Sequence, residues 1–281
     1  MSKTQTLENR VTKTGRLADI FPLFEKDTIS TSAQLTNERR ANAKLRNKWY
    51  YTANAAVYAN EQGRAVLYFV EGADNPIFNN IPESTKQLIE KGNYEVKNSD
   101  LELIVNSKNT LKVELASLKL QGDDSERRYF EIDTSKYDKT LNKTQRQFAE
   151  KVYGKGRDFK KNMKMLSGNG ISKTRIHVLN PEYVLKNVQK GCAVARACWL
   201  YNFNSNSNFD ANYRNVDNNN NALHGVLKET AEGGRKKMYD SGNIYADIDN
   251  SVQYLIKHST KINGAQINKL LNLVNEHYKK K

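Results

Sequence analysis

Charge is segregated along this 281-residue chain, and the segregation constrains which segments can form one unit. Lysine and arginine exceed aspartate and glutamate by 4 over residues 30–64 and by 7 over 139–164, whereas residues 65–138 carry a net charge of −5. A charge that only kept the chain dissolved would be spread evenly along it. The sequence therefore predicts a mildly acidic unit set between basic stretches.

Three segments follow from this pattern. We predict an N-terminal arm over residues 1–29, a helix with a small antiparallel β unit over 30–138, and a basic, helix-rich part over 139–281. Because 38% of the residues are hydrophobic, the chain can bury a substantial core. The expected fold class is α+β: a small antiparallel β-sheet with packed helices, followed by a helix-rich C-terminal half.

The spacing of apolar residues predicts one long helix over residues 33–62. Leu45, Trp49 and Ala53 recur on one helical face. Because Trp49 and the two tyrosines that follow it also favour strands, a switch from helix to strand near this tryptophan stays open. A second long helix is expected over 181–201, where an asparagine and a proline mark its start.

Short apolar runs predict the strands. Residues 65–70 form a continuous apolar run that is typical of a buried strand, and strands are also expected over 101–105 and 174–179. A short polar turn separates residues 110–120 from 128–132. We therefore expect these two segments to pair as an antiparallel hairpin.

Residues 202–221 contain ten asparagines in twenty positions, which is low-complexity sequence. So polar a segment buries little apolar surface, and we predict a flexible loop. Its amides could contact bases, because an amide both donates and accepts hydrogen bonds. Shorter helices are expected over 83–91, 139–153, 249–258 and 264–278.

Lysines and arginines gather beside aromatic residues at four places, a pattern typical of nucleic-acid binding. Cations attract the phosphate backbone, and aromatic rings stack on unpaired bases. Two cationic stripes would flank the apolar face of the 33–62 helix, and the glycines within 154–170 would let a basic loop approach a ligand closely. The candidate nucleic-acid-binding residues are Arg39, Arg40, Lys44, Arg46, Lys48, Trp49, Tyr50, Arg127, Arg128, Tyr129, Lys155, Arg157, Phe159, Lys160, Lys161, Lys164, Arg235, Lys236 and Lys237.

The formal net charge of +14 at pH 7 agrees with a polyanionic partner. We expect a non-catalytic, largely sequence-independent nucleic-acid-binding protein that prefers single strands, with RNA favoured over DNA. It would coat a strand or form the backbone of a ribonucleoprotein, and contacts between copies would make it a homo-oligomer. Three alternatives stay open: a structural assembly protein of a virion or filament, a metal-dependent nuclease, and an inhibitor or interaction protein that acts on a nucleic-acid-binding complex.

Familiar catalytic signatures are missing from the sequence, which has no Walker A, GxGxxG, HExxH or GxSxG motif. The four histidines lack the spacing of metal ligands. We therefore expect no catalytic residue, no cofactor and no metal. A nuclease would instead draw on the carboxylates and lysines near the expected hairpin. These are Asp100, Glu102, Glu114, Glu131, Asp133, Lys112 and Lys119.

Cysteine content and hydropathy bear on the compartment. Cys192 and Cys198 are the two cysteines of the chain, and a helix would place them on different faces, which agrees with a reducing environment. The most apolar run covers nine residues from Ala193 to Tyr201, interrupted by Arg196, and is far short of the about 20 that cross a bilayer. With a polar N-terminus that lacks a secretory signal, the sequence predicts a cytoplasmic protein with no membrane partner.

Overall fold

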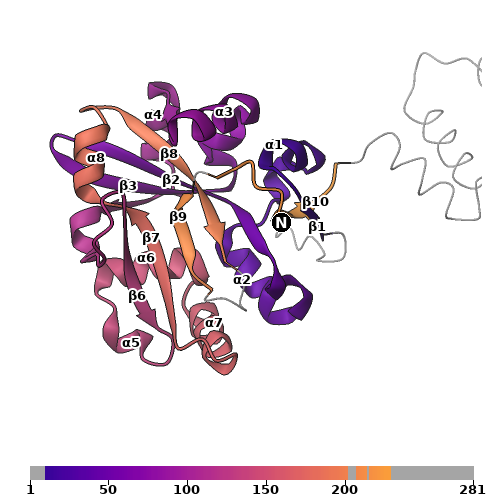
Figure 1. Cartoon of the computed structure of the whole chain (residues 1–281). Coiled ribbons are helices and arrows are strands. Elements are labelled where there is room, and N and C mark those ends of the chain that lie inside the picture. Colours follow the sequence, from indigo (N-terminus) through magenta and orange to yellow (C-terminus); the bar gives the residue numbers. More distant parts are fainter. Residues whose placement is uncertain (1–9, 202–206, 214, 229–281) are drawn as a thin grey trace, which may run out of the picture. The chain divides into compact units, whose positions relative to one another are not determined.

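The structure, a computed structural model, describes residues 10–201, 207–213 and 215–228. Met1–Lys228 form one compact unit, and the second unit, Glu229–Lys281, lies outside the described residues. The strands of the described part join in one ten-stranded sheet, whose main path runs β1-β10-β2-β8-β9-β7-β6. Helices lie on both faces of this sheet (Figure 1).

A hairpin of two long strands forms the centre of the sheet. Strand β2 (Trp49–Glu61) pairs antiparallel with β3 (Arg64–Glu71), and Glu61 lies opposite Arg64. The two residues between them, Gln62 and Gly63, have φ angles of 53° and 86°. Positive φ at both positions is the geometry of a tight hairpin turn whose twist matches that of the strands.

The remaining strands extend the sheet on both sides of this hairpin. On the other edge of β2 lies β8 (Ala193–Leu200), which pairs with β4 (Tyr94–Val96) and with β9 (Phe209–Tyr213). Strand β9 is parallel to β7 (Lys173–Leu179), and β7 is antiparallel to β6 (Arg127–Asp133). Strand β5 (Leu111–Glu114) pairs with β3.

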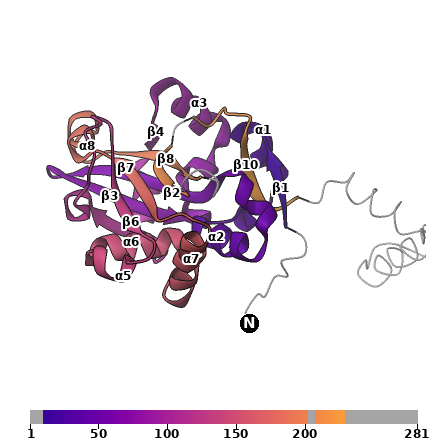
Figure 2. The ribbon, with the colours of Figure 1, turned by 60° about the horizontal axis from the view of Figure 1, so that its bottom comes forward.

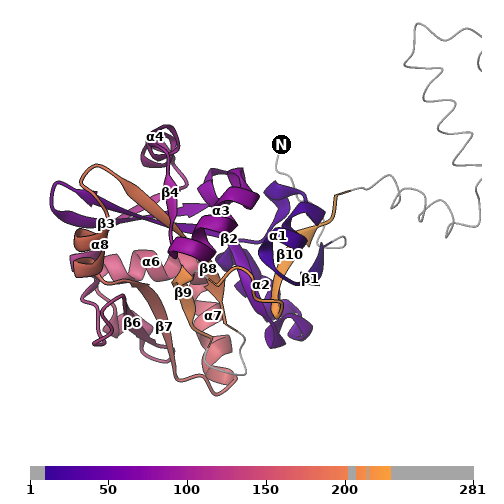
Figure 3. The same ribbon diagram turned by 45° about the horizontal axis from the view of Figure 1, so that its top comes forward.

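The first and last described strands lie side by side (Figure 3). Strand β1 (Arg10–Thr14) runs antiparallel to β10 (Asn221–Val226) along its whole length. Strand β10 in turn pairs in parallel with the start of β2, where Asn221 lies opposite Trp49. The start and the end of the described part are thus joined within one sheet.

Two hydrophobic cores form, one on each face of the sheet, because side chains alternate along a strand. In β2, Tyr58 belongs to one core and its neighbour Val57 to the other. The first core is covered by α2 (Ser32–Ala41), α6 (Lys143–Tyr153), α7 (Arg157–Gly168) and α8 (Pro181–Asn187). The second is covered by α1 (Leu17–Ile20), α3 (Ile81–Lys91) and α4 (Asn98–Asn106), and Figure 2 shows α3 and α7 on opposite sides.

The fold class predicted from the sequence is wrong. The sheet is large and mixed rather than small and antiparallel, and the second half of the described part contributes strands β7 to β10 rather than mainly helices. The two long helices account for most of the error. The 33–62 segment is helical only to Ala41, passes through a 3₁₀ turn (Ala43–Asn47) and then becomes β2. The 181–201 segment is helical only to Asn187 and then becomes β8.

The cause of these errors is burial on both faces. A strand in the middle of a sheet covered by helices reads as a continuous apolar run, and periodicity cannot separate such a run from a buried helix. The switch to a strand near Trp49, which the sequence left open, is what the structure shows.

The predicted hairpin is also wrong. Strand β5 pairs with β3 and strand β6 with β7, so β5 and β6 are not partners, and one isolated bridge joins Gln121 to Tyr129. The strand expected over 101–105 is helix α4. Strands β3, β6 and β7 confirm the other strand predictions, and α3 and α6 confirm two helices.

The structure modifies two further predictions, and others concern residues outside the described part. The basic loop expected over 154–170 is largely helix α7, and the asparagine-rich segment contributes β9 and the start of β10. The helices predicted over 249–258 and 264–278 lie outside the described residues. Cys192 is exposed, Cys198 is buried, and both thiols are free. Among the helices that the structure describes, none combines the length and hydropathy needed to cross a lipid bilayer.

Candidate functional site

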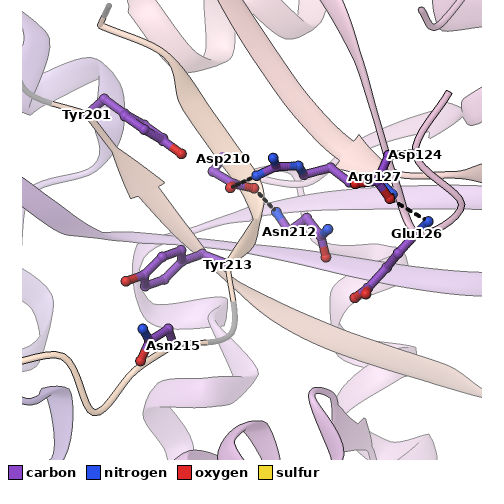
Figure 4. Close-up of a pocket in the computed structure, with 8 residues that line it drawn as sticks. All are labelled: Asp124, Glu126, Arg127, Tyr201, Asp210, Asn212, Tyr213 and Asn215. Carbon is purple, nitrogen blue, oxygen red and sulfur yellow. Dashed lines mark hydrogen bonds and ion pairs between the residues drawn. The ribbon is translucent and has the colours of Figure 1, made fainter. Parts of the chain in front are cut away.

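A polar and aromatic pocket opens where the segment before β6 meets the asparagine-rich segment (Figure 4). Its volume of about 260 Å³ is close to that of one large side chain. Drug-sized ligands usually occupy roughly 300–1,000 Å³. The pocket therefore suits one side-chain-sized group better than a whole small molecule. Its lining residues are Asp124, Glu126, Arg127, Tyr201, Asp210, Asn212, Tyr213 and Asn215.

Asp124 and Arg127 set the geometry at the start of β6. Asp124 Oδ1 accepts the backbone N–H groups of Glu126 and Arg127 at 2.8 and 3.0 Å, and these bonds lower the pKa of the Asp124 carboxyl. Arg127 Nη1 lies 3.2 Å from Asp210 Oδ2, and only 4% of the Asp210 side chain is exposed. Burial raises the pKa of Asp210, although the Asn212 N–H and Arg127 oppose this change. A buried carboxylate thus holds an arginine that is 41% exposed at the pocket.

A second ion pair joins Glu126 to β8. Arg196 on β8 is fully buried, and its Nη2 lies 2.9 Å from Glu126 Oε1. Its Nε donates to Asn93 Oδ1 at 2.7 Å. Because breaking a buried ion pair leaves an uncompensated charge, these contacts fix Glu126 in place. The wall formed by residues 124–127 is therefore anchored to the central sheet.

Aromatic rings form the opposite wall. Tyr213 stacks on Trp199 with ring centroids 4.3 Å apart and planes 17° apart, and Tyr201 packs against the same tryptophan at 4.6 Å. Trp49 meets Trp199 edge-on at 5.0 Å. Asn221 donates to the Tyr213 hydroxyl at 2.9 Å. Contacts of this kind restrict ring motion, so the two tyrosines present a rigid surface to the pocket.

Asn212 lines the pocket and is largely buried. The residue is 8% exposed, and its Oδ1 is buried with no hydrogen-bond partner among the described residues. In Figure 4 its side-chain amide lies between Tyr213 and Glu126. Leaving a buried polar atom unpaired costs roughly 1–3 kcal/mol.

The Arg39 side chain connects α2 to the backbone next to the pocket. The guanidinium of Arg39 is fully buried and donates to three backbone carbonyls, those of Leu45, Lys48 and Tyr201, at 3.2, 2.7 and 2.7 Å. Burial lowers its pKa to about 9, which leaves it protonated at neutral pH. Arg39 thus ties α2 to the backbone of the pocket residue Tyr201.

The cationic stripes predicted over 33–62 do not form, because the helix ends at Ala41. Arg40 pairs with Asp158 at 3.1 Å, and Arg46 donates to the Arg39 carbonyl at 2.8 Å. Lys44 and Lys48 are exposed, and Lys48 Nζ donates to Thr14 at 2.9 Å. Tyr50 is buried, and Trp49 is half-buried in the aromatic wall.

Strand β6 carries three of the predicted residues. Arg127 lines the pocket, whereas Arg128 is half-buried. Tyr129 packs against His177 at 5.4 Å, and the Arg175 guanidinium lies 4.5 Å from its ring centroid. The predicted cluster Arg235, Lys236 and Lys237 lies outside the described residues.

Helix α7 brings most of the remaining predicted cations together. Lys160, Lys161 and Lys164 are exposed, as are Lys155 and Arg157, and none of the five has an ion-pair partner within the described ranges. The spacing of the cations from Arg157 to Lys164 places them along one side of the helix. Phe159 is fully buried below Arg146, whose guanidinium lies 4.6 Å from its ring. The structure thus offers a basic helix face without a stacking ring from Phe159.

The carboxylates considered for a nuclease are dispersed. Asp100 and Glu102 lie on α4, Glu114 ends β5, and Glu131 and Asp133 lie on β6. Glu131 is held by Lys173 and Arg175 at 2.6 and 3.3 Å. In the described ranges, no group of three metal-ligating side chains comes together.

Sequence reasoning found Arg127 but missed the other side chains of the pocket. Asp210 and Tyr213 lie in the segment that composition marks as a loop, and Tyr201 ends the segment that was expected to be a helix. The available signal was the presence of tyrosines and an aspartate among the asparagines, since such residues recur at recognition surfaces.

Comparisons with known proteins identify the fold. No family model and no curated protein matches the chain. One solved structure is described as "Accommodation of massive sequence variation in Nanoarchaeota by the C-type lectin fold". It is similar to this chain with a TM-score of 0.53 and 12% sequence identity, over 78% of this chain and 96% of that one. At this identity the likeness shows the fold alone, which is C-type lectin-like.

Proposed function

We propose that this protein is a non-catalytic recognition module, and that its pocket binds a group presented by a macromolecular partner. The observation that carries the proposal is a side-chain-sized pocket between two walls that buried contacts hold in place. The acidic wall is anchored by Arg196 and the aromatic wall by Trp199, so the pocket is preorganised for contact. Preorganisation of this kind reduces the ordering cost of binding.

The separation of scaffold and surface supports the same function. The solved structure similar in fold is described as accommodating massive sequence variation. In this chain the pocket residues Asp210, Asn212 and Tyr213 lie on β9 and Asn215 lies just beyond it. Tyr213 also packs against the second core, whereas Asn215 belongs to neither core. Exposed pocket residues such as Asn215 can therefore be exchanged without removing core volume, which would let them set specificity.

A matched pair of substitutions tests the proposal. Asn215 and Asn219 are both exposed asparagines of one segment, but only Asn215 lines the pocket. We expect peptides selected from a displayed random library on the wild-type protein to bind Asn219→Trp unchanged. Binding to Asn215→Trp should weaken by at least about 10-fold, because the indole would fill the opening. Selected peptides that bind both variants as tightly as the wild type would overturn the proposal.

A second candidate, nucleic-acid binding, rests on helix α7. Four exposed cations of α7 and Lys155, which lies just before the helix, have no acidic partner in the described part of the chain. Full engagement of five phosphates on a single strand gives a salt slope of roughly −3.5, equivalent to about 100-fold weaker binding between 50 and 200 mM salt. Phosphate attraction of this kind carries no sequence information.

Charge reversal tests this second candidate. The variant Lys160→Glu/Lys161→Glu/Lys164→Glu should lose most affinity for a single-stranded oligonucleotide of about 20 nucleotides, measured by fluorescence anisotropy. The control Lys86→Glu/Lys97→Glu/Lys108→Glu changes the net charge equally, at exposed lysines of the acidic segment. Equal losses in both variants would show that net charge, and not the α7 face, attracts the oligonucleotide.

A further inference from the structure

Helix α7 is the centre of a basic surface on the side of the sheet that carries the first core. Helix α5 (Tyr137–Thr140) packs against it, with the ring centroids of Tyr137 and Phe159 5.4 Å apart, and exposes Lys139. In Figure 1 both helices lie at the lower end of the view, opposite α3 and α4. We call the cations at α7 the basic surface: Lys155, Arg157, Lys160, Lys161 and Lys164.

The acidic side chains of α6 and α7 are already engaged with other cations. Glu150 on α6 pairs with Arg146 at 2.9 Å, and Asp158 on α7 pairs with Arg40 at 3.1 Å. The five cations of the basic surface find no acidic partner within the described ranges. Their charge is therefore available to a polyanion.

The length of the basic surface suits a duplex. Arg157 and Lys164 are seven positions apart on α7, which is about 10 Å along a helix axis. A nucleic-acid duplex carries one negative charge for about every 1.7 Å of its axis, so about six phosphate charges lie beside such a length. The side chains of the basic surface can thus be matched by phosphates of one short stretch of duplex.

Aromatic side chains decide between a duplex and a single strand. Proteins that hold single strands stack the unpaired bases on accessible rings. Among the described residues no phenylalanine, tryptophan or tyrosine is exposed, and Phe159, which the sequence placed in the basic stretch, is fully buried. Tyr137 is half-buried, and the Arg146 guanidinium lies 5.5 Å from its ring centroid. The bases of a duplex are stacked on one another and need no such ring.

We infer that the basic surface binds the phosphate backbone of a nucleic-acid duplex, and not the single strand that the sequence predicted. The lysines and the arginine contact phosphates, which fixes the position of the duplex but reads no base. This inference rests on the second candidate of the proposed function, because it names the class of nucleic acid that α7 would bind.

The salt dependence of binding distinguishes the two classes. Contact of five cations with a duplex gives a salt slope of roughly −4.5, equivalent to about 500-fold weaker binding between 50 and 200 mM salt. The same five contacts with a single strand give roughly −3.5, or about 100-fold.

Three labelled probes test the inference by fluorescence anisotropy with the full chain. They are a duplex of about 20 base pairs in DNA, the same duplex in RNA, and an unstructured single strand of about 40 nucleotides with an equal number of phosphates. We expect at least one duplex to bind at least about 5-fold more tightly than the single strand, with the steeper salt slope. The two duplexes show which sugar the surface accepts.

A charge-reversal pair locates the contact. Lys160→Glu/Lys161→Glu/Lys164→Glu removes three phosphate contacts, so the size of the duplex salt slope should fall by about 2.7. Lys86→Glu/Lys97→Glu/Lys108→Glu alters exposed lysines elsewhere and should leave the slope unchanged. Far-ultraviolet circular dichroism of both variants verifies that the helices are intact.

The outcomes separate this inference from the candidate beneath it. A single strand that binds as tightly as both duplexes, and still loses affinity in the α7 variant, refutes the duplex and keeps nucleic-acid binding. No binding of any probe at 50 mM salt, or equal losses in both triple variants, refutes nucleic-acid binding by α7 altogether. Vesicles of equal parts phosphatidylserine and phosphatidylcholine that displace the duplex at a lower concentration of anionic groups would assign the surface to a membrane instead.

Discussion

Replacing Arg39 by glutamine should strongly destabilise the protein, although sequence reasoning placed this arginine on a nucleic-acid-binding surface. Its guanidinium donates to three carbonyls, and its carbon Cζ lies 5.1 Å from the Tyr50 ring centroid. A hydrogen bond from a charged donor contributes about 1.5–3 kcal/mol. Glutamine retains one donor group, and the energies of the three hydrogen bonds are not additive. We therefore expect the free energy of unfolding to fall by about 3–5 kcal/mol.

Arg40 supplies the matched control for this substitution. It is the next residue on α2, and its side chain is 31% exposed while paired with Asp158. Arg40→Gln removes the same charge but should lower the free energy of unfolding by only about 0.5–1 kcal/mol. Arg39→Gln, in contrast, should lower the melting temperature by about 10 °C, at about 2–4 °C for each kcal/mol.

Urea unfolding followed by tryptophan fluorescence measures both losses, because Trp49 and Trp199 lie in the aromatic wall next to Tyr201. Equal stability of the two variants would refute the structural role assigned to Arg39. If Arg39→Gln instead kept full stability but lost oligonucleotide affinity, the surface role predicted from the sequence would be restored.

Two further predictions concern buried polar groups. The Tyr58 hydroxyl donates to the Ala211 carbonyl at 2.8 Å and accepts the Leu179 N–H at 3.2 Å, so Tyr58→Phe should lower the free energy of unfolding by about 1–3 kcal/mol. Denaturant titration should show a clearly smaller loss for Tyr183→Phe, a half-buried tyrosine of α8. Burial, together with the nearby positive charges of Arg127 and Arg175, lowers the pKa of His177 from 6.5 to about 4. The fold thus favours the neutral ring, and stability present above pH 6.5 should fall by up to about 3 kcal/mol as the pH drops towards 4. His177→Gln should flatten this part of the stability profile, and an unchanged slope would contradict the assignment.

The parts of the fold that could be predicted are those with local signals. Strand β3 is a short apolar run, and α6 has the asparagine cap and the apolar face that predict a helix. Strands β2 and β8 carry conflicting signals. Ala53 and Ala56 fit a helical face as well as two faces of a strand, and only the helices packed on both sides of the sheet decide between them.

The candidate site was harder to predict for a related reason. Arg127 and Asp210 are far apart in sequence, and they meet because β7 lies between β6 and β9 in the sheet. The unpaired oxygen of Asn212 depends on what surrounds it, which composition does not reveal. Exposed cations were easier to find, since charge is a property of the residue itself, but Arg39 shows that a cation in the sequence need not lie at the surface.

The pairing of β1 with β10 has a consequence for synthesis in the cell. Arg10 lies opposite Val226, so β1 lacks its β10 partner until almost the whole described chain has followed it. Such long-range pairing slows folding, because a large loop must close before the contact forms. During that interval the β1 segment is an unpaired strand edge, open to capture by another nascent copy. The fold therefore leaves β1 exposed to such capture until residue 226 has left the ribosome.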